Sequence, residues 1–84
     1  MSHEILVAPA AARDLKKLPP EHRERVRSAA STLAKDPRAR AEKLVGEDAY
    51  RIRVGDYRIV FLVDDVERRV MIVRIRHRRE AHRR

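Results

Sequence analysis

The spacing of apolar residues predicts a strand and two helices in the first half of the chain. Residues 3–7 include the aliphatic and β-branched run Ile5-Leu6-Val7, which is typical of a short strand. In residues 10–18 and 21–35, apolar side chains recur every three or four positions, as they do on one face of a helix. The two prolines at 19–20 end the first helix and open the second, because proline lacks the N–H that a helix interior needs. We therefore expect a hairpin of two helices after the first strand.

The second half changes to the two-residue period of β-strands. Residues 50–54 and 57–63 follow this period, and only Gly55 and Asp56 separate them, which is the length of a tight hairpin turn. Residues 69–76 are rich in valine, methionine and isoleucine and predict a further strand. The resulting order, βααβββ, predicts an α+β fold in which an antiparallel sheet carries the N-terminal helical hairpin on one face.

The two-residue turn determines which residues face one another across the hairpin. Val54 faces Tyr57, so Arg53 faces Arg58, and Arg51 lies on the same side of the sheet. Like charges opposed in this way destabilise a sheet by roughly a few tenths to 1 kcal/mol. The arrangement favours a cradle for phosphate, although the arginines could also simply extend into water. The other side is expected to pack under the helices and carries only apolar or aromatic residues: Tyr50, Ile52, Val54, Tyr57, Ile59, Phe61 and Val63.

The register of the last strand depends on the length of the turn before it. With a five-residue turn, Val70 faces Leu62, and the even-numbered residues of the strand lie on the arginine side. Arg74, Arg76 and Arg78 would then extend the cradle. An apolar strip beside them, on the side that the helices leave open, is expected to dock a helix or strand of a partner. The residues of this strip are Val60, Leu62, Val70 and Ile72.

The composition adds a large excess of positive charge. The chain has 21 lysine and arginine residues against 13 aspartate and glutamate residues, a formal net charge of +8 and a pI near 11.0. This charge favours an anionic partner, nucleic acid above all. From Arg74 onward the sequence reads RIRHRREAHRR. A guanidinium binds phosphate oxygens with paired hydrogen bonds, whereas an ammonium offers a point charge. The alternative for this segment is a solvated tail.

Length and residue types exclude several classes of protein. The 84 residues are expected to form one domain, 1–84, too small for a dinucleotide-binding fold or a buried cofactor. The absence of cysteine excludes disulfides, thiol catalysis and zinc ribbons. The longest apolar run, 5–12, is too short for a bilayer, so we expect a cytoplasmic protein with no membrane partner. His77 and His82 lack the carboxylates or thiolates of a metal site, and neither a metal nor a cofactor is expected.

Three segments resemble the RelE/ParE superfamily of bacterial toxins, and the RelE branch in particular. They are ARDLKKLP at 12–19, YRIRVGDYRIVF at 50–61 and VRIRHRRE at 73–80. The resemblance covers essentially the whole chain and implies a RelE-like fold of the microbial ribonuclease type. It also implies a toxin of a type II toxin–antitoxin system that cleaves mRNA on the 70S ribosome without a metal, inhibits translation, and is neutralised by a cognate antitoxin.

The resemblance further implies which residues form the active site. The family's basic residues on the two hairpin strands and after the last strand correspond to Arg51, Arg53, Arg58 and Arg78. At the end of the chain, His82 stands where many relatives carry a tyrosine, and Arg76 replaces a glycine.

RNA cleavage without a metal also needs groups that move protons. Arginines can stabilise the charge of the phosphorane, but a guanidinium stays protonated and is a poor base. Among His77, Glu80 and His82, imidazole suits neutral pH best, and His77 faces away from the arginine side. We therefore expect His82 to carry the proton, unless it is a terminal residue without a role. The further arginines expected to bind RNA phosphates are Arg74, Arg76 and Arg79.

Three other functions remain open at this stage. The ParE branch shares the fold but inhibits DNA gyrase, and its members usually lack clustered basic residues on the first hairpin strand. A non-catalytic RNA-binding module is another alternative, although Tyr50, Tyr57 and Phe61 are expected in the core and not on a stacking surface. The third is an inactive family member, because the terminal tyrosine is missing.

Overall fold

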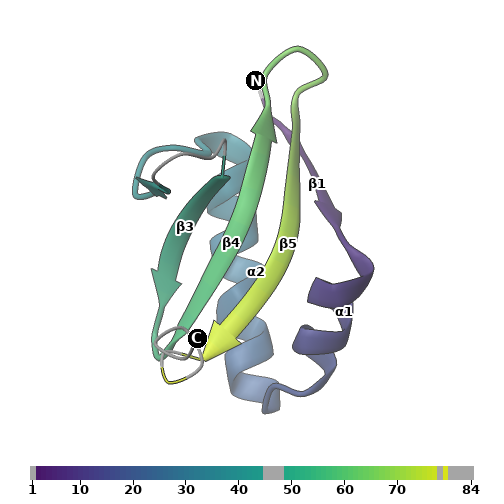
Figure 1. Cartoon of the computed structure of the whole chain (residues 1–84), viewed down its shortest axis with the longest axis vertical. Coiled ribbons are helices and arrows are strands. Elements are labelled where there is room, and N and C mark those ends of the chain that lie inside the picture. Colours follow the sequence, from purple (N-terminus) through teal and green to yellow (C-terminus); the bar gives the residue numbers. More distant parts are fainter. Residues whose placement is uncertain (1, 45–48, 78, 80–84) are drawn as a thin grey trace.

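A computed structural model describes residues 2–44, 49–77 and 79 and shows a five-stranded sheet with one long helix across its back (Figure 1). In this view α2 lies behind the sheet and α1 lies beside β1 and β5, so the reader faces the uncovered side. The predicted α+β class is confirmed. The elements are β1 (Glu4–Val7), α1 (Pro9–Lys16), α2 (Pro20–Lys35), β2 (Glu42–Lys43), β3 (Ala49–Val54), β4 (Tyr57–Asp64) and β5 (Arg69–His77).

The sheet has the order β1-β5-β4-β3-β2 and is mixed. All neighbouring strands run antiparallel except β1, which runs parallel to β5. The prediction of a purely antiparallel sheet is therefore wrong for β1. Parallel neighbours need a long connection, and here the helices and the β3–β4 hairpin together supply it. The strand β2 was not predicted, because two residues are too few to show a period.

The core lies between α2 and the sheet, on the side predicted for it. Ile59 and Phe61 on β4 are fully buried, and Val26 and Leu33 of α2 are also part of the core. Both helices begin with a proline, as expected for a position whose N–H has no partner in the helix. In the described part of the chain, neither helix is long and apolar enough to cross a membrane.

The register of the β3–β4 hairpin is the predicted one. Val54 pairs with Tyr57, and Arg53 pairs with Arg58. Gly55 has a φ of +60°, a conformation that glycine adopts without strain. A side chain at Gly55 would also come within 3.2 Å of Nη1 of Arg25. The positive φ therefore favours glycine at this turn, and Arg25 of α2 lies next to the arginine-rich hairpin.

The predicted register of β5 is wrong by one residue at its start. Val70 pairs with Val63, and Leu62 pairs with Met71. Val70 and Ile72 are consequently buried in the core, at 0% and 2% exposure, and do not belong to an apolar strip on the open side. The turn is one residue shorter than expected because Asp64 still pairs, with Arg69.

A β-bulge then reverses the facing of the second half of β5. Val60 pairs with Arg74 while Phe61 pairs with Ile72, so Val73 is the extra residue. Because of this bulge, Arg74 and Arg76 lie on the open side after all. The predicted position of these two arginines is confirmed, although the register that predicted it is not.

The helix α1 covers the part of the β5 edge that β1 leaves open. Asp14 Oδ2 accepts hydrogen bonds from Nε of Arg74, at 2.8 Å, and from the backbone N–H of Ile75, at 2.9 Å. Burial raises the pKa of the Asp14 carboxyl, but the hydrogen bonds from Arg74 and Ile75 and the positive charges of Arg74 and Lys17 together lower it by more, so the pKa lies below its usual value. Asp14 therefore joins α1 to the sheet.

We expect Asp14→Ala to lower the free energy of unfolding by about 1–3 kcal/mol, because the N–H of Ile75 loses its acceptor. Asp14→Asn keeps an acceptor and should cost less. Since the folded pKa of Asp14 is lowered, its charge contributes stability above about pH 4, and this contribution is lost as the pH falls through the folded pKa. Urea titrations of both variants and of the unchanged protein at pH 7 and pH 3 measure these free energies of unfolding. Equal free energies for Asp14→Ala and the unchanged protein at pH 7 would contradict the expected role of Asp14.

Candidate nucleic-acid interface

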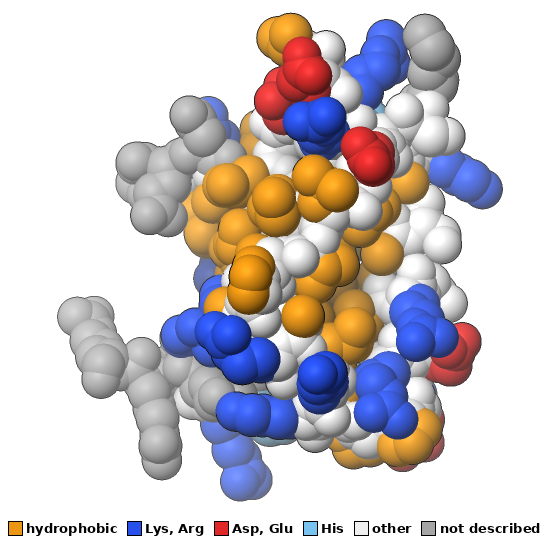
Figure 2. Space-filling model, turned by 90° about the vertical axis from the view of Figure 1, so that its right-hand side faces the viewer, with side chains coloured by type: hydrophobic (Ala, Val, Ile, Leu, Met, Phe, Trp, Pro, Cys, Tyr) orange, Lys and Arg blue, Asp and Glu red, His pale blue; other side chains and the backbone are white. Residues whose placement is uncertain are grey.

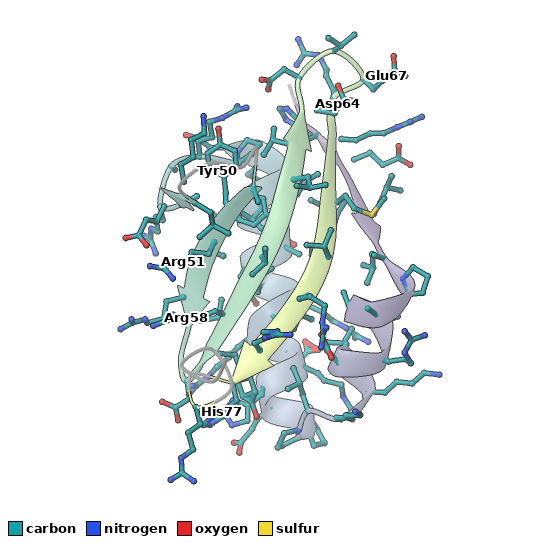
Figure 3. The ribbon with its side chains drawn as sticks, viewed as in Figure 1. Tyr50, Arg51, Arg58, Asp64, Glu67 and His77 are labelled. Atoms are coloured by element: carbon teal, nitrogen blue, oxygen red, sulfur yellow. The ribbon has the colours of Figure 1, made fainter. Side chains whose placement is uncertain are left out.

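The open side of the sheet carries arginines from three strands. Arg51 and Arg53 lie on β3, Arg58 lies on β4, and Arg74 and Arg76 lie on β5. We call these five residues the arginine face. In the view of Figure 3, Arg51 of β3 lies above Arg58 of β4, and His77 lies at the end of β5. The predicted grouping of Arg51, Arg53 and Arg58 on one side of the sheet is thus confirmed.

Three of these arginines form a row across the sheet. Arg58 pairs with Arg53 on one side and with Arg76 on the other. Within residues 2–44, 49–77 and 79, no hydrogen bond or ion pair joins the side chain of any of the three to another residue. Opposed like charges without a carboxylate between them destabilise the sheet. A bound anion would remove this repulsion, so the row is a candidate binding site for phosphate.

The other two arginines of the face are held by carboxylates. Nε of Arg51 donates to Oε1 of Glu42 on β2 at 2.6 Å, and Nε of Arg74 donates to Asp14. Glu42 is 65% exposed, so water screens this ion pair and an arriving phosphate can compete for Arg51. Asp14 is only 13% exposed and holds Arg74 more firmly. Arg74 is therefore positioned by α1, whereas Arg51 stays available to a ligand.

A hollow of about 250 Å³ lies on the β3 side of the arginine face. It brings together Arg51, Arg53 and Arg58, the three predicted catalytic residues that the structure describes. It also includes Arg40, which sequence reasoning missed because Arg40 lies in the loop before β2 and follows no periodic pattern. The residues that line this hollow, named hollow 1, are Arg40, Glu42, Arg51, Ile52, Arg53 and Arg58.

The remaining predicted residues lie at the end of β5. Arg78 and His82 fall outside the described residues. Arg79 is exposed, and its backbone N–H donates to Nδ1 of His77 at 3.2 Å. His77 pairs with Tyr57 and lies edge-on to its ring, with 5.1 Å between the ring centroids. It faces away from the arginine face, as predicted.

An apolar hollow of about 280 Å³ lies further along the open side, over β1, β5 and β4. Val60 and Leu62 are on this side, as predicted, and Leu62 is 42% exposed. Leu6 and Met71 take the places predicted for Val70 and Ile72, because of the shifted register and the parallel pairing of β1. Figure 2 shows the side of the molecule with β1 and α1, where an apolar patch lies above a band of basic side chains. The apolar hollow is lined by Leu6, Leu62, Val63, Asp64, Arg69 and Met71.

Residues 5–82 match the family of the ParE toxin of the type II toxin-antitoxin system, parDE. No curated protein gives a significant match to the sequence. Solved structures of similar chains are known. A chain of the RelBE2 toxin-antitoxin complex from Mycobacterium tuberculosis is 30% identical, over 92% of this chain and 99% of its own, with a TM-score of 0.86.

Two further complexes contain similar chains. One is the archaeal RelE-RelB complex from Pyrococcus horikoshii, with 25% identity over 93% of this chain and 97% of the other, and a TM-score of 0.80. The other is the intact E. coli RelBE toxin-antitoxin complex, with 25% identity over 90% and 96%, and a TM-score of 0.82. The family match and the shared fold point to the same superfamily that the sequence of the arginine-rich hairpin resembles. The chain belongs to the RelE/ParE superfamily and is a toxin of a type II toxin–antitoxin system.

Proposed function

We propose that the chain is an endoribonuclease that cleaves mRNA on the ribosome, inhibits translation and is neutralised by a cognate antitoxin. The observation that carries this proposal is the row of Arg53, Arg58 and Arg76, which lacks carboxylate partners in the described part of the chain and whose first two members line hollow 1. A row of this kind costs folding stability and is useful only when an anion binds. The arginines on neighbouring β-strands, together with the small hollow 1, suit one phosphodiester linkage of single-stranded RNA.

The proposed reaction uses the RNA's own 2′-hydroxyl as the nucleophile. The hydroxyl loses its proton and attacks the adjacent phosphorus, and the 5′-oxygen leaves with a proton. Arg51, Arg53 and Arg58 stabilise the phosphorane by hydrogen bonds directed at its oxygens. They remain cationic throughout, so the proton must pass through other groups. Arg78 as a further charge-stabilising residue and His82 as the proton carrier stay predictions from the sequence.

The remaining arginines extend the surface beyond the reacting linkage. Arg76 continues the row across β5, and Arg79 is exposed directly after this strand. Both are proposed to bind flanking phosphates. Arg74 is proposed to contribute less than expected from the sequence, because Asp14 already accepts two hydrogen bonds from its guanidinium. Its charge is thereby largely compensated.

A cognate antitoxin is the proposed partner of the apolar hollow. Relatives of this chain were crystallised with RelB antitoxins, which supports a partner of the same kind. The corrected docking surface consists of Leu6, Val60, Leu62 and Met71. A peptide bound there lies beside the arginine face, where acidic side chains could pair with the uncompensated row. Such binding would neutralise the toxin by occupying both surfaces.

One observation favours a second candidate function. The matching family is that of ParE toxins, and the ParE branch inhibits DNA gyrase. The identities of 25–30% to chains from RelE complexes and the uncompensated arginine row weigh toward RNA cleavage.

Two assays on the toxin released from its antitoxin distinguish mRNA cleavage from inhibition of DNA gyrase. In a cell-free translation extract we expect arrest, with mRNA ends mapping inside the codon at the ribosomal A site. In a gyrase assay we expect unchanged supercoiling at the same toxin concentration. EDTA is added once the toxin has bound the ribosome, at a concentration that chelates the free divalent ions. The primer-extension products that report mRNA cleavage should still form. Blocked supercoiling without mRNA cleavage would replace the proposal by the gyrase function.

A further inference from the structure

A second hollow, of about 370 Å³, lies where α2 meets β3. It adjoins hollow 1, since Arg40, Ile52 and Arg53 line both of them. The two hollows together form a path from the arginine face around the edge of β3 to the helix side. The residues that line this second hollow, named hollow 2, are Ser28, Ala29, Thr32, Arg40, Ile52, Arg53 and Val54.

The path exists because two structural features leave the edge of β3 uncovered. The strand β2 pairs only with Tyr50 and Arg51, so it ends before Ile52. On the helix side, the residues of α2 that face this edge are small, namely Ser28, Ala29 and Thr32. Larger side chains at these positions would fill the gap between helix and strand.

The chemistry of hollow 2 suits one nucleotide. Two guanidinium groups, those of Arg40 and Arg53, border it, and no acidic residue is among the described residues that line it. Ala29, Ile52 and Val54 give it an apolar floor. The hydroxyl of Thr32 donates to the carbonyl oxygen of Ser28 at 3.3 Å, so its oxygen can still accept a hydrogen bond. An apolar floor is suited to a base or sugar, and two guanidinium groups beside it are suited to a phosphate.

We infer that hollow 2 binds the nucleotide next to the scissile linkage, with Arg53 shared between the two phosphates. This inference rests on the proposed function and adds a subsite to it. The ligand class is single-stranded RNA that extends past the reacting linkage. Arg40 binds the extended part of the RNA strand, since it lies in the loop before β2 and borders both hollows. A nucleotide held there anchors the strand while hollow 1 takes the reacting phosphate.

Binding of short RNA to the released full-length toxin tests the inference. The probes are fluorescently labelled 2′-O-methyl oligoribonucleotides of two and six nucleotides, which lack the nucleophile and cannot be cleaved. We expect Ser28→Trp, at a residue that lines hollow 2 and not hollow 1, to weaken binding of the six-nucleotide probe about tenfold and to change binding of the two-nucleotide probe less than twofold. Because Arg40 borders both hollows, Arg40→Gln should weaken binding of both probes, and that of the six-nucleotide probe more. Arg40→Gln should also reduce the slope of log Kd against log salt by about 0.7, the value for one phosphate contact on a single strand.

Two control variants match these changes. Arg27→Gln removes one charge from an exposed position of α2, and Ser31→Trp adds the same bulk to an exposed neighbour outside hollow 2. Both should bind the two probes like the unchanged toxin. Circular dichroism of every variant verifies that the fold is retained, and both test positions, Ser28 and Arg40, are exposed.

The outcomes separate this inference from the proposed function. Equal binding of the six-nucleotide probe by Arg40→Gln, Ser28→Trp and the unchanged toxin would overturn the subsite, whether or not the toxin cleaves mRNA. Weakened binding of an acidic antitoxin peptide, with RNA binding unchanged, would overturn it in favour of a protein ligand. Absence of mRNA cleavage together with the expected length dependence would instead reject the nuclease and keep hollow 2 as an RNA site.

Discussion

Replacing Arg58 by alanine is expected to lower the rate of mRNA cleavage by about two to three orders of magnitude, the usual cost of removing one donor that stabilises transition-state charge. Arg58 is the central member of the row, with Arg53 and Arg76 as its neighbours, and it borders hollow 1. Its guanidinium can therefore reach the phosphorane together with Arg51 and Arg53. Single-turnover cleavage on programmed ribosomes, at saturating toxin, measures this step without the influence of binding.

The same substitution should also stabilise the fold slightly. Because Arg58 is repelled by two opposed arginines, its removal is expected to raise the free energy of unfolding by up to about 1 kcal/mol. A variant that is more stable and far less active would show that the row serves function at the expense of folding. Loss of activity through unfolding would have the opposite sign in urea titrations, so the two causes are distinguishable.

Two further variants complete the test of Arg58. Arg58→Lys keeps the charge but loses the paired hydrogen bonds of a guanidinium, so an intermediate rate is expected. Arg27→Ala removes one charge at a position that is 70% exposed on α2, and it should cleave at the unchanged rate. Cleavage by Arg58→Ala at the rate of the unchanged toxin would remove the arginine row from the proposed mechanism.

The parts of the site that the sequence could predict are those determined by local rules. A two-residue turn leaves one register for its hairpin, so the pairing of Arg53 with Arg58 follows from the positions of Gly55 and Asp56. The core side of β3 and β4 follows from the same rule. The spacing of the arginines alone did not decide whether they bind phosphate or extend into water. The resemblance to a toxin family indicated that they form the active site.

The parts that the sequence could not predict depend on contacts between distant segments. The predicted side is wrong for Ile72 because the turn before β5 is one residue shorter than its sequence indicates, since Asp64 still pairs with Arg69. The predicted side is right for Arg76 because a bulge at Val73, which has no signature in the alternation of β5, reverses the facing after it. Asp14 and Arg40 acquire their roles only when α1 meets β5 and the loop before β2 meets β3.

The corrected docking surface gives the second large prediction. We expect Leu62→Asp to weaken binding of the cognate antitoxin by about 100-fold or more, because it removes an apolar contact and places a carboxylate in the apolar hollow. Leu62 is 42% exposed in the free toxin, so the substitution leaves the core intact. Arrest of translation should be unchanged, since Leu62 lies outside hollow 1. Titration calorimetry with the antitoxin measures the affinity, and co-expression measures the rescue of growth.

The control for this experiment is Val66→Asp, which makes the same kind of change at a residue that is 89% exposed in the turn between β4 and β5. Antitoxin should neutralise this variant like the unchanged toxin. If docking instead followed general exposed hydrophobicity, Val66→Asp would weaken binding at least as much as Leu62→Asp, because Val66 is the more exposed. If neutralisation rested only on acidic side chains at the arginine face, neither substitution would change it. Loss confined to Leu62→Asp therefore requires a partner seated in the apolar hollow, beside the arginines that it neutralises.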